Sequence, residues 1–117
     1  MGNGYKDLVV WQKSKNFCVD IYKLTEEFPK SEMFGLVSQL RRASVSIPSN
    51  IAEGSKRNTT KDQGQFYAIA YGSGAEIETQ LEISKELFPQ LKEKITVLEN
   101  NLNEIMKMLN KLKSYNH

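Results

Sequence analysis

Apolar residues recur along most of the chain at alternating intervals of three and four positions, a spacing that places them on one face of an α-helix. No stretch shows the sustained alternation of apolar and polar residues that is typical of a half-buried strand. The first helical stripe comprises Val10, Ser14, Phe17, Ile21, Leu24 and Phe28. Pro29 follows this stripe and removes a backbone donor, so the first helix should end there. The pattern predicts an all-α protein.

A second helix is expected from about Ser31, whose hydroxyl can accept from the first free amides, to about Glu53. Its buried face should comprise Met33, Leu36, Val37, Leu40, Ser44, Ile47 and Ile51. Gly54 is expected to end this helix in a left-handed conformation. Pro48 lies inside the helix and removes one backbone hydrogen bond, so we expect a kink near Pro48.

Two further helices follow from the same kind of spacing. Thr60 and Gln63 have the spacing of a capping box, which predicts the start of the third helix near Lys61. The third stripe comprises Phe66, Ala70, Ser73, Ile77, Leu81, Ser84 and Phe88, and the fourth comprises Leu91, Ile95, Leu98, Leu102, Ile105, Leu109 and Leu112. Pro89 fits the first turn of the fourth helix. Because short connections favour antiparallel neighbours, residues 1–117 should form a single domain, an antiparallel up-down-up-down four-helix bundle.

The middle of the third helix is rich in small residues. Gly72 and Gly74 each cost about 1 kcal/mol relative to alanine in a helix interior, so their presence suggests a gain elsewhere. Close approach by another helix is the simplest gain. The two glycines do not form a dinucleotide-binding fingerprint, because no strand precedes them and no third glycine follows at the required position.

Composition limits the class of protein. Of the 117 residues, 39% are hydrophobic and 26% are charged, as in ordinary folded domains. The net charge of +2 is too small for a protein that holds nucleic acid by overall charge alone, so any such contact must come from local clustering. No apolar run could span a bilayer and no signal peptide is visible, which predicts a cytoplasmic protein with no membrane partner. A single cysteine, Cys18, excludes an intramolecular disulfide.

Candidate catalytic and metal-ligating residues are scarce. The single histidine is His117, the last residue, so a His-based triad or metal cluster cannot be built inside the fold. Glu76, Glu78, Glu82 and Glu86 lack the histidine partners of carboxylate metal sites in helical bundles, and a solvated acidic face explains them. We therefore expect no enzymatic activity, no cofactor and no metal site.

The charges are nevertheless unevenly distributed. Residues 35–61 carry five cations against Glu53, a net +4, whereas residues 76–86 carry a net −3. The cations are Arg41, Arg42, Lys56, Arg57 and Lys61. A polar ribbon along the second helix is formed by Arg42, Ser46, Asn50, Glu53 and Arg57. Two interpretations stay open: the polar ribbon binds a partner, or its members form internal and surface hydrogen bonds, including an ion pair of Glu53 with Arg57.

Four stretches of the chain carry a resemblance to a known family. They are KDLVVWQKSKNF (6–17), YKLTEEFP (22–29), GLVSQLRRASVSIPSNIAEG (35–54) and AYGSGAEIETQLEIS (70–84). In this order they resemble the four-helix-bundle proteins encoded within intervening sequences of bacterial 23S ribosomal RNA genes. The combination of SQLRRA with SIPSNIAEG is long enough to be specific. This family is similar to accessory proteins of diversity-generating retroelements, which form barrel-shaped homopentamers and engage nucleic acid and a reverse transcriptase through basic residues.

The resemblance implies a non-enzymatic homo-oligomer, a pentamer, that binds RNA or a nucleoprotein partner through a basic patch on the second helix and the loop after it. The contact residues carried over are Arg41, Arg42, Lys56 and Arg57, and the polar ribbon and charge pattern add Asn50 and Lys61. Structural roles are expected for Pro48, Gly54, Gly72 and Gly74. The small residues of the third helix and the opposite charges of the second and third helices offer ring-forming contacts between copies. The alternative is a protein-binding adaptor or scaffold without nucleic-acid affinity.

Overall fold

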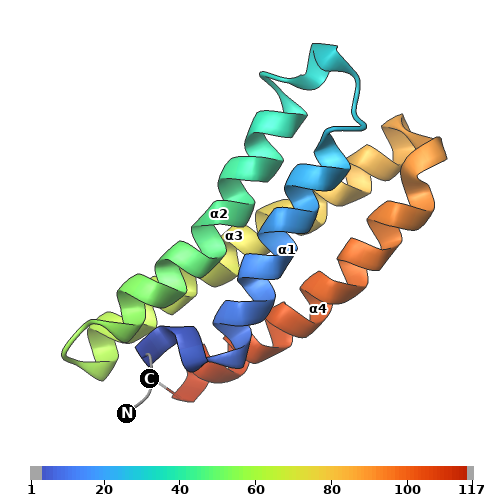
Figure 1. The fold of residues 1–117 in the computed structure, drawn as a ribbon. Helices are drawn as coiled ribbons and strands as arrows, with labels where there is room; N and C mark the ends of the chain where they lie inside the picture. The colour runs from blue at the N-terminus through green and yellow to red at the C-terminus, as the bar shows by residue number, and fades with distance from the viewer. Residues whose placement is uncertain (1–3, 116–117) are drawn as a thin grey trace.

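The computed structural model describes residues 4–115, which form four long helices joined by short connections (Figure 1). The helices are α1 (Val9–Thr25), α2 (Leu36–Ser55), α3 (Thr60–Leu87) and α4 (Lys92–Tyr115). Three short 3-10 helices precede α1, α2 and α4: η1 (Gly4–Asp7), η2 (Lys30–Glu32) and η3 (Pro89–Leu91). The described part of the chain contains no strand, which confirms the all-α prediction.

Each helix packs against two of the others. α1 contacts α2 and α4, and α3 contacts α2 and α4, whereas the diagonal pairs do not meet within residues 4–115. Contacts between α2 and α3 run in opposite order along the two helices: Gln39 meets Gln80 at one end, and Ser46 meets Ser73 further along. Figure 1 shows the same reversal of direction at each connection. The predicted four-helix bundle is confirmed.

The predicted stripes form the core. All six members of the first stripe are buried, and the stripe of α4 is buried except at the half-buried Leu112. At one end of the bundle the rings of Phe28 and Phe88, which follow the ends of α1 and α3, lie 4.8 Å apart, centroid to centroid. Burial of these apolar side chains is the main favourable term in the stability of the bundle.

Ion pairs supplement the core along the α1–α4 surface. Lys13 lies 3.2 Å from Glu104, and Lys94 lies 2.8 Å from Glu27. All four side chains are substantially exposed, so each pair contributes at most about 1 kcal/mol. The two pairs orient α4 against α1 rather than hold the fold together.

α2 begins later than the apolar spacing predicts. The chain after Pro29 forms η2, and Gly35, with φ −114° and ψ −109°, lies outside the helical and extended regions, so a regular helix cannot continue through it. The amide of Leu36 donates to the carboxylate of Glu32 at 3.4 Å. Met33 is 47% exposed, so the prediction that it belongs to the core is wrong.

The start of α3 differs from the prediction by one residue. Thr59, not Thr60, is the N-cap, and its hydroxyl accepts from the amide of Asp62 at 3.1 Å. The side chain of Gln63 does not complete a capping box, because its amide donates to the carbonyl of Arg57 at 3.2 Å. The predicted cap at Thr60 is therefore wrong by one position.

Gly54 has a different role from the one expected. α2 continues to Ser55, and among the described residues only Gly4 has a positive φ, so the prediction of a left-handed Gly54 is wrong. A Cβ at position 54 would lie 2.7 Å from Cε1 of Tyr67 and 3.1 Å from Cβ of Phe66. Glycine is required here because it allows the Tyr67 ring to lie directly against the backbone of α2.

The two glycines of α3 differ from each other. Gly74 is buried, and a Cβ there would overlap the sulfur of Met106 on α4, which is the close approach expected from the sequence. Gly72 is exposed, and a Cβ there would have no atom within 4 Å. Packing inside the bundle therefore explains Gly74 and gives no reason for Gly72.

Pro48 lies inside α2, which is continuous from Leu36 to Ser55. The hydroxyl of Ser44 donates to the carbonyl of Arg41 at 2.9 Å, one turn before the proline. The side-chain amide of Asn50 donates to the carbonyl of Ser46 at 2.8 Å. Side chains before and after Pro48 thus donate to backbone carbonyls that precede it, and the kink itself stays a prediction.

We expect Gly54→Ala to lower the free energy of unfolding by about 1–3 kcal/mol, the usual cost of overpacking a close contact, although alanine favours a helix more than glycine does. Neither the buried ring of Tyr67 nor Cβ of Phe66 can withdraw without a shift of α3. Ser49→Ala, at an exposed position of the same helix, is the control and should change this energy by less than about 0.5 kcal/mol. Urea unfolding followed by circular dichroism measures both variants, and an unchanged midpoint for Gly54→Ala would contradict this account.

Candidate functional site

Arg41 is engaged within the bundle. Its Nε donates to the hydroxyl of Thr25 at 2.9 Å, and its Nη2 donates to the carbonyl of Tyr22 at 3.2 Å. The guanidinium also lies 4.6 Å from the centroid of the Tyr22 ring. Arg41 therefore ties α2 to the last turn of α1, where free carbonyl groups accept hydrogen bonds from cations.

Arg42, the next residue, lies on the other side of α2. It is exposed and makes no hydrogen bond or ion pair with another residue that the structure describes. One helical step of about 100° separates the two arginines, so one faces α1 and the other faces solvent. Of this pair, Arg42 is the side chain available to a ligand.

The middle of the polar ribbon belongs to the α2–α3 interface. The side-chain amide of Asn50 donates to Oγ of Ser46 at 3.0 Å, and the hydroxyl of Ser73 on α3 donates to the same Oγ at 2.8 Å. Near the end of α2, Arg57 lies 3.2 Å from Glu53. The internal hydrogen-bond interpretation therefore describes Ser46 and Asn50, and the predicted ion pair of Glu53 with Arg57 is present.

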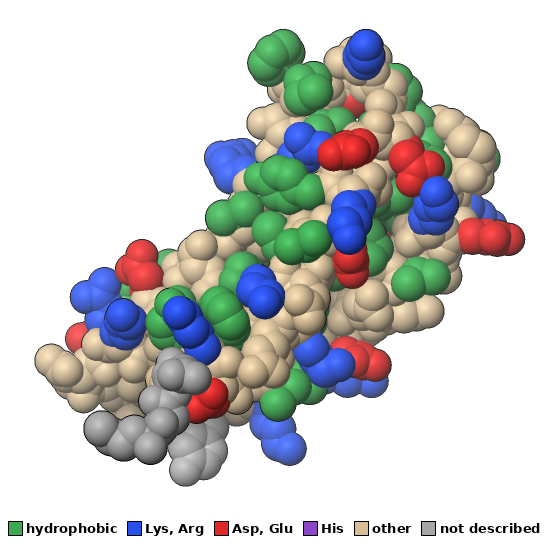
Figure 2. All heavy atoms as spheres, viewed as in Figure 1, with side chains coloured by type: hydrophobic (Ala, Val, Ile, Leu, Met, Phe, Trp, Pro, Cys, Tyr) green, Lys and Arg blue, Asp and Glu red, His purple; other side chains and the backbone are tan. Residues whose placement is uncertain are grey.

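The remaining predicted cations lie at one end of the bundle. Lys56, Arg57 and Lys61 are exposed around the connection from α2 to α3. Lys6 of η1 lines the same hollow as Lys56, and Lys113 of α4 lies over Tyr71 of α3. We call these five residues the basic end: Lys6, Lys56, Arg57, Lys61 and Lys113. Figures 1 and 2 show η1, the last turns of α4 and several Lys or Arg side chains at this end, at the lower left of the view.

Three cations of the basic end lie over aromatic rings. Nζ of Lys56 is 5.6 Å from the centroid of Tyr5, and the guanidinium of Arg57 is 4.6 Å from that of Phe66. Nζ of Lys113 is 4.2 Å from the centroid of Tyr71. These distances are within the range of cation–π attraction. The basic end thus combines positive charge with aromatic surface.

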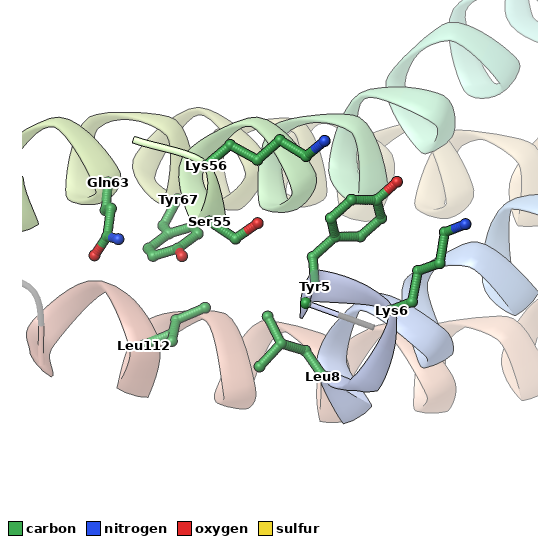
Figure 3. A pocket seen from close by; sticks show the side chains of 9 residues that line it. Tyr5, Lys6, Leu8, Ser55, Lys56, Gln63, Tyr67 and Leu112 are labelled. Carbon is green, nitrogen blue, oxygen red and sulfur yellow. The ribbon is translucent and has the colours of Figure 1, made fainter. Parts of the chain in front are cut away.

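A hollow of about 650 Å³ opens between η1, the end of α2, the start of α3 and α4 (Figure 3). The described residues that line it are Gly4, Tyr5, Lys6, Leu8, Ser55, Lys56, Gln63, Tyr67 and Leu112. Figure 3 shows the ring of Tyr67 projecting from α3 into this hollow, between Gln63 and Ser55. Tyr67 is only 4% exposed, and burial raises the pKa of its phenol. We call this feature the Tyr67 hollow.

The acidic residues of α3 do not converge on a metal site. Lys85 lies 2.9 Å from both Glu82 and Glu99. The hydrogen bond from Lys85 lowers the pKa of Glu82, and the bonds to Glu99 and then Glu82 raise the pKa of Lys85. Within residues 4–115, no three His, Cys, Asp or Glu side chains are grouped so as to hold a metal ion. His117 lies outside the described residues.

Among the helices that the structure describes, none is both long enough and apolar enough to cross a bilayer.

Comparisons with known proteins decide the family. The model of the family described as 23S rRNA-intervening sequence protein matches residues 6–111. The chain belongs to this family. A crystal structure from Bacteroides thetaiotaomicron VPI-5482, described as a protein with unknown function from the S23 ribosomal protein family, is similar at a TM-score of 0.80 and 28% identity. The similarity covers 90% of this chain and 98% of that one. No match is found among curated proteins.

In this 23S rRNA-intervening sequence protein, the segment that carries the family resemblance has largely structural roles. Leu40, Ile47 and Ile51 are fully buried, Arg41 anchors α1, and Gly54 accommodates Tyr67. SQLRRA and SIPSNIAEG therefore encode mainly how α2 packs against α1 and α3. The exposed cations that follow this segment are better placed for a ligand than most of the segment itself.

The sequence interpretation missed several residues of the site. Lys6, Tyr5 and Lys113 lie far along the chain from α2, and nothing in the local spacing links them to Lys56. A weak signal was present: Tyr5 and Lys6 are adjacent and precede the first apolar stripe, where their side chains have no core position to fill. The bundle fold brings them to the basic end.

The raised pKa of Tyr67 predicts a pH dependence of stability. Because the folded protein holds the phenolic proton more tightly than the unfolded chain, the contribution is complete below about pH 10 and is lost as pH rises further. Tyr67→Phe should therefore lose less stability between pH 9 and pH 11 than the unchanged protein. Tyr22→Phe is the control, since Tyr22 is 41% exposed, and should keep the full loss. Urea midpoints at the two pH values measure this, and equal losses in both variants would contradict it.

Proposed function

We propose that this 23S rRNA-intervening sequence protein is a non-enzymatic, self-associating bundle that binds RNA, alone or in a nucleoprotein partner, through the basic end. The observation that supports this most strongly is the placement of Lys56, Arg57 and Lys113 over aromatic rings. Proteins that bind single-stranded RNA combine cations for phosphates with aromatic rings on which unpaired bases stack. The basic end offers both groups side by side.

The charge arrangement agrees with this proposal. Four of the five cations, all except Arg57, make no ion pair with a described residue. These four ammonium groups are therefore not held by a described carboxylate, although the whole chain carries only +2. Phosphate contacts of this kind supply sequence-independent affinity through counterion release. Arg42, exposed further along α2, extends the positive surface away from the basic end.

Self-association is the second part of the proposal. The outer face of α3 exposes Ile69, Ile83 and Leu87 at 51%, 45% and 56%, and Gly72 lies on the same face with open space around it. A second copy packed on this face would bury the apolar side chains and would account for Gly72 through close backbone approach. A homopentamer, as the family resemblance implies, would carry five basic ends and so raise the affinity for one RNA through multivalency.

RNA binding is tested with Arg57→Gln/Lys61→Gln. Each phosphate contact on a single strand contributes about 0.7 to the slope of log affinity against log salt, so losing two contacts should reduce the slope by about 1.4. The control, Lys30→Gln/Lys92→Gln, removes the same charge from exposed positions outside the basic end and should leave the slope unchanged. Fluorescence anisotropy with a labelled RNA hairpin that carries a single-stranded overhang measures affinity between 50 and 200 mM salt. A flat salt response of the unchanged protein would overturn the proposal.

Self-association is tested with Ile69→Glu/Ile83→Glu. Both positions are already exposed in the bundle, so the substitutions should leave it folded and shift the assembly towards monomers by placing charge in the interface. Val97→Glu, a 58% exposed position on α4, is the matched control and should keep the assembly size. Light scattering coupled to size-exclusion chromatography gives the masses. A monomeric unchanged protein would refute the self-association part of the proposal.

A protein-binding adaptor is the second candidate function, and one observation favours it. Phe34, between η2 and α2, is 97% exposed, and the neighbouring Met33 is 47% exposed. Exposed aromatic side chains of this kind often anchor protein interfaces. Under this second reading, Arg57→Gln/Lys61→Gln should leave any RNA affinity and its salt slope unchanged.

A further inference from the structure

The Tyr67 hollow has the composition of a ligand site. Its volume of about 650 Å³ lies within the roughly 300–1,000 Å³ of small-molecule sites. Two lysines and no acidic side chain are among the described residues that line it, so the hollow favours an anion. Lys6 lies near the N-terminus and Lys56 near the middle of the sequence, and only the folded bundle brings both to one hollow, on either side of Tyr5 in Figure 3.

The other lining groups indicate what the anion carries. Tyr5 offers an aromatic ring, and Leu8 and Leu112 offer apolar surface. Ser55, Gln63 and Tyr67 offer hydroxyl and amide groups. A ligand that matches these groups has a flat ring, a polar body and at least one phosphate.

Tyr67 adds a more specific argument. The residue is 4% exposed, yet its hydroxyl makes no hydrogen bond with the residues that the structure describes. Among the described residues, the buried side-chain polar atom without a partner is Oε1 of Gln80, so the Tyr67 hydroxyl reaches the open space of the hollow. A ligand oxygen there can accept its hydrogen bond in place of water. Like any tyrosine phenol, that of Tyr67 is protonated at neutral pH, so it can donate to a phosphate or ribose oxygen.

We propose that the Tyr67 hollow binds a nucleoside monophosphate, with the phosphate between Lys6 and Lys56, the base against Tyr5 and the hydroxyl of Tyr67 donating to the ligand. Two sources share this chemistry: a free mononucleotide and the 5′-phosphorylated end of an RNA strand. A strand end enters the hollow more easily than an internal nucleotide, because only one neighbouring nucleotide must be accommodated. If the ligand is the end of an RNA strand, the inference rests on the proposed RNA-binding function and makes it more specific. If the ligand is a free mononucleotide, the inference is independent of that function.

Trp11 supplies a direct readout. It is the single tryptophan of the chain, and its ring lies 5.2 Å from that of Tyr5, centroid to centroid. A base placed against Tyr5 should therefore change the fluorescence of Trp11. Titration with AMP should give a saturable change, and adenosine, which lacks the phosphate, should bind at least about tenfold more weakly.

Two variants test the assigned contacts. Lys6→Gln/Lys56→Gln should weaken AMP binding at least about tenfold, because both cations that face the phosphate are removed. Tyr67→Phe keeps the ring against Gly54, so the bundle should fold, and it should weaken AMP binding about threefold or more through loss of the hydroxyl. Lys111→Gln, an exposed position on α4 that does not line the hollow, is the charge-matched control and should bind as the unchanged protein does.

A second experiment asks whether the ligand is a free mononucleotide or a strand end. It compares the affinities of two RNA strands of the same sequence, one with a 5′-phosphate and one with a 5′-hydroxyl. At least about fivefold tighter binding of the phosphorylated strand, lost in Lys6→Gln/Lys56→Gln but kept in Arg57→Gln/Lys61→Gln, supports the strand end. AMP binding with equal affinity for the two strands supports the free mononucleotide. RNA binding without either AMP binding or end preference overturns the inference and leaves the proposed function standing. AMP binding without RNA binding overturns the RNA function and supports the hollow, and no binding of any kind overturns both.

Discussion

The close contact between Gly54 and Tyr67 is the constraint on which the site depends. Because position 54 has no Cβ, the Tyr67 ring can lie against the backbone of α2, and α3 approaches α2 closely where the two helices meet their connection. This approach places Lys56 and Ser55 beside Tyr67 and across from η1, so that one packing contact shapes the α2–α3 interface and the wall of the Tyr67 hollow. The contact also positions part of the basic end, since Lys56 and Arg57 lie in the connection that it holds in place and Lys61 lies in the first turn of α3.

The position of the site at one end of the bundle also has a physical reason. The interior is filled along its length by the apolar stripes of the four helices, and protein interiors of this kind leave little space for a ligand. At the basic end, η1 covers the bundle and contacts α1 and α2, and the space between these elements and α4 is lined by polar as well as apolar side chains. Lys85, in contrast, is already paired with Glu82 and Glu99 on the α3–α4 flank, which leaves that surface with a net negative charge.

Much of the fold could be predicted from the sequence because helix periodicity is a local property. The stripes of α1 and α4 are buried as their spacing indicates, since each residue's direction depends only on its place along the helix. Helix boundaries were harder to predict: the second helix was expected from Ser31 but begins after Gly35, because the chain that leaves Pro29 first forms η2. The role of Gly54 could not be predicted, because the ring that requires it lies on another helix and no local pattern reports that contact.

Only part of the candidate site could be predicted, because the sequence reports local patterns and not the contacts between separate elements. A run of cations identifies basic segments, but helical phase decides which members face solvent: adjacent Arg41 and Arg42 separate into an internal anchor and an exposed charge. The aromatic partners of Lys56 and Lys113 come from other elements, so their pairing exists only in three dimensions. These pairings change what the basic end can recognise. Exposed lysines alone would hold any polyanion, whereas cations held beside aromatic rings favour an anion that also carries flat, unpaired bases, which is the chemistry of single-stranded RNA.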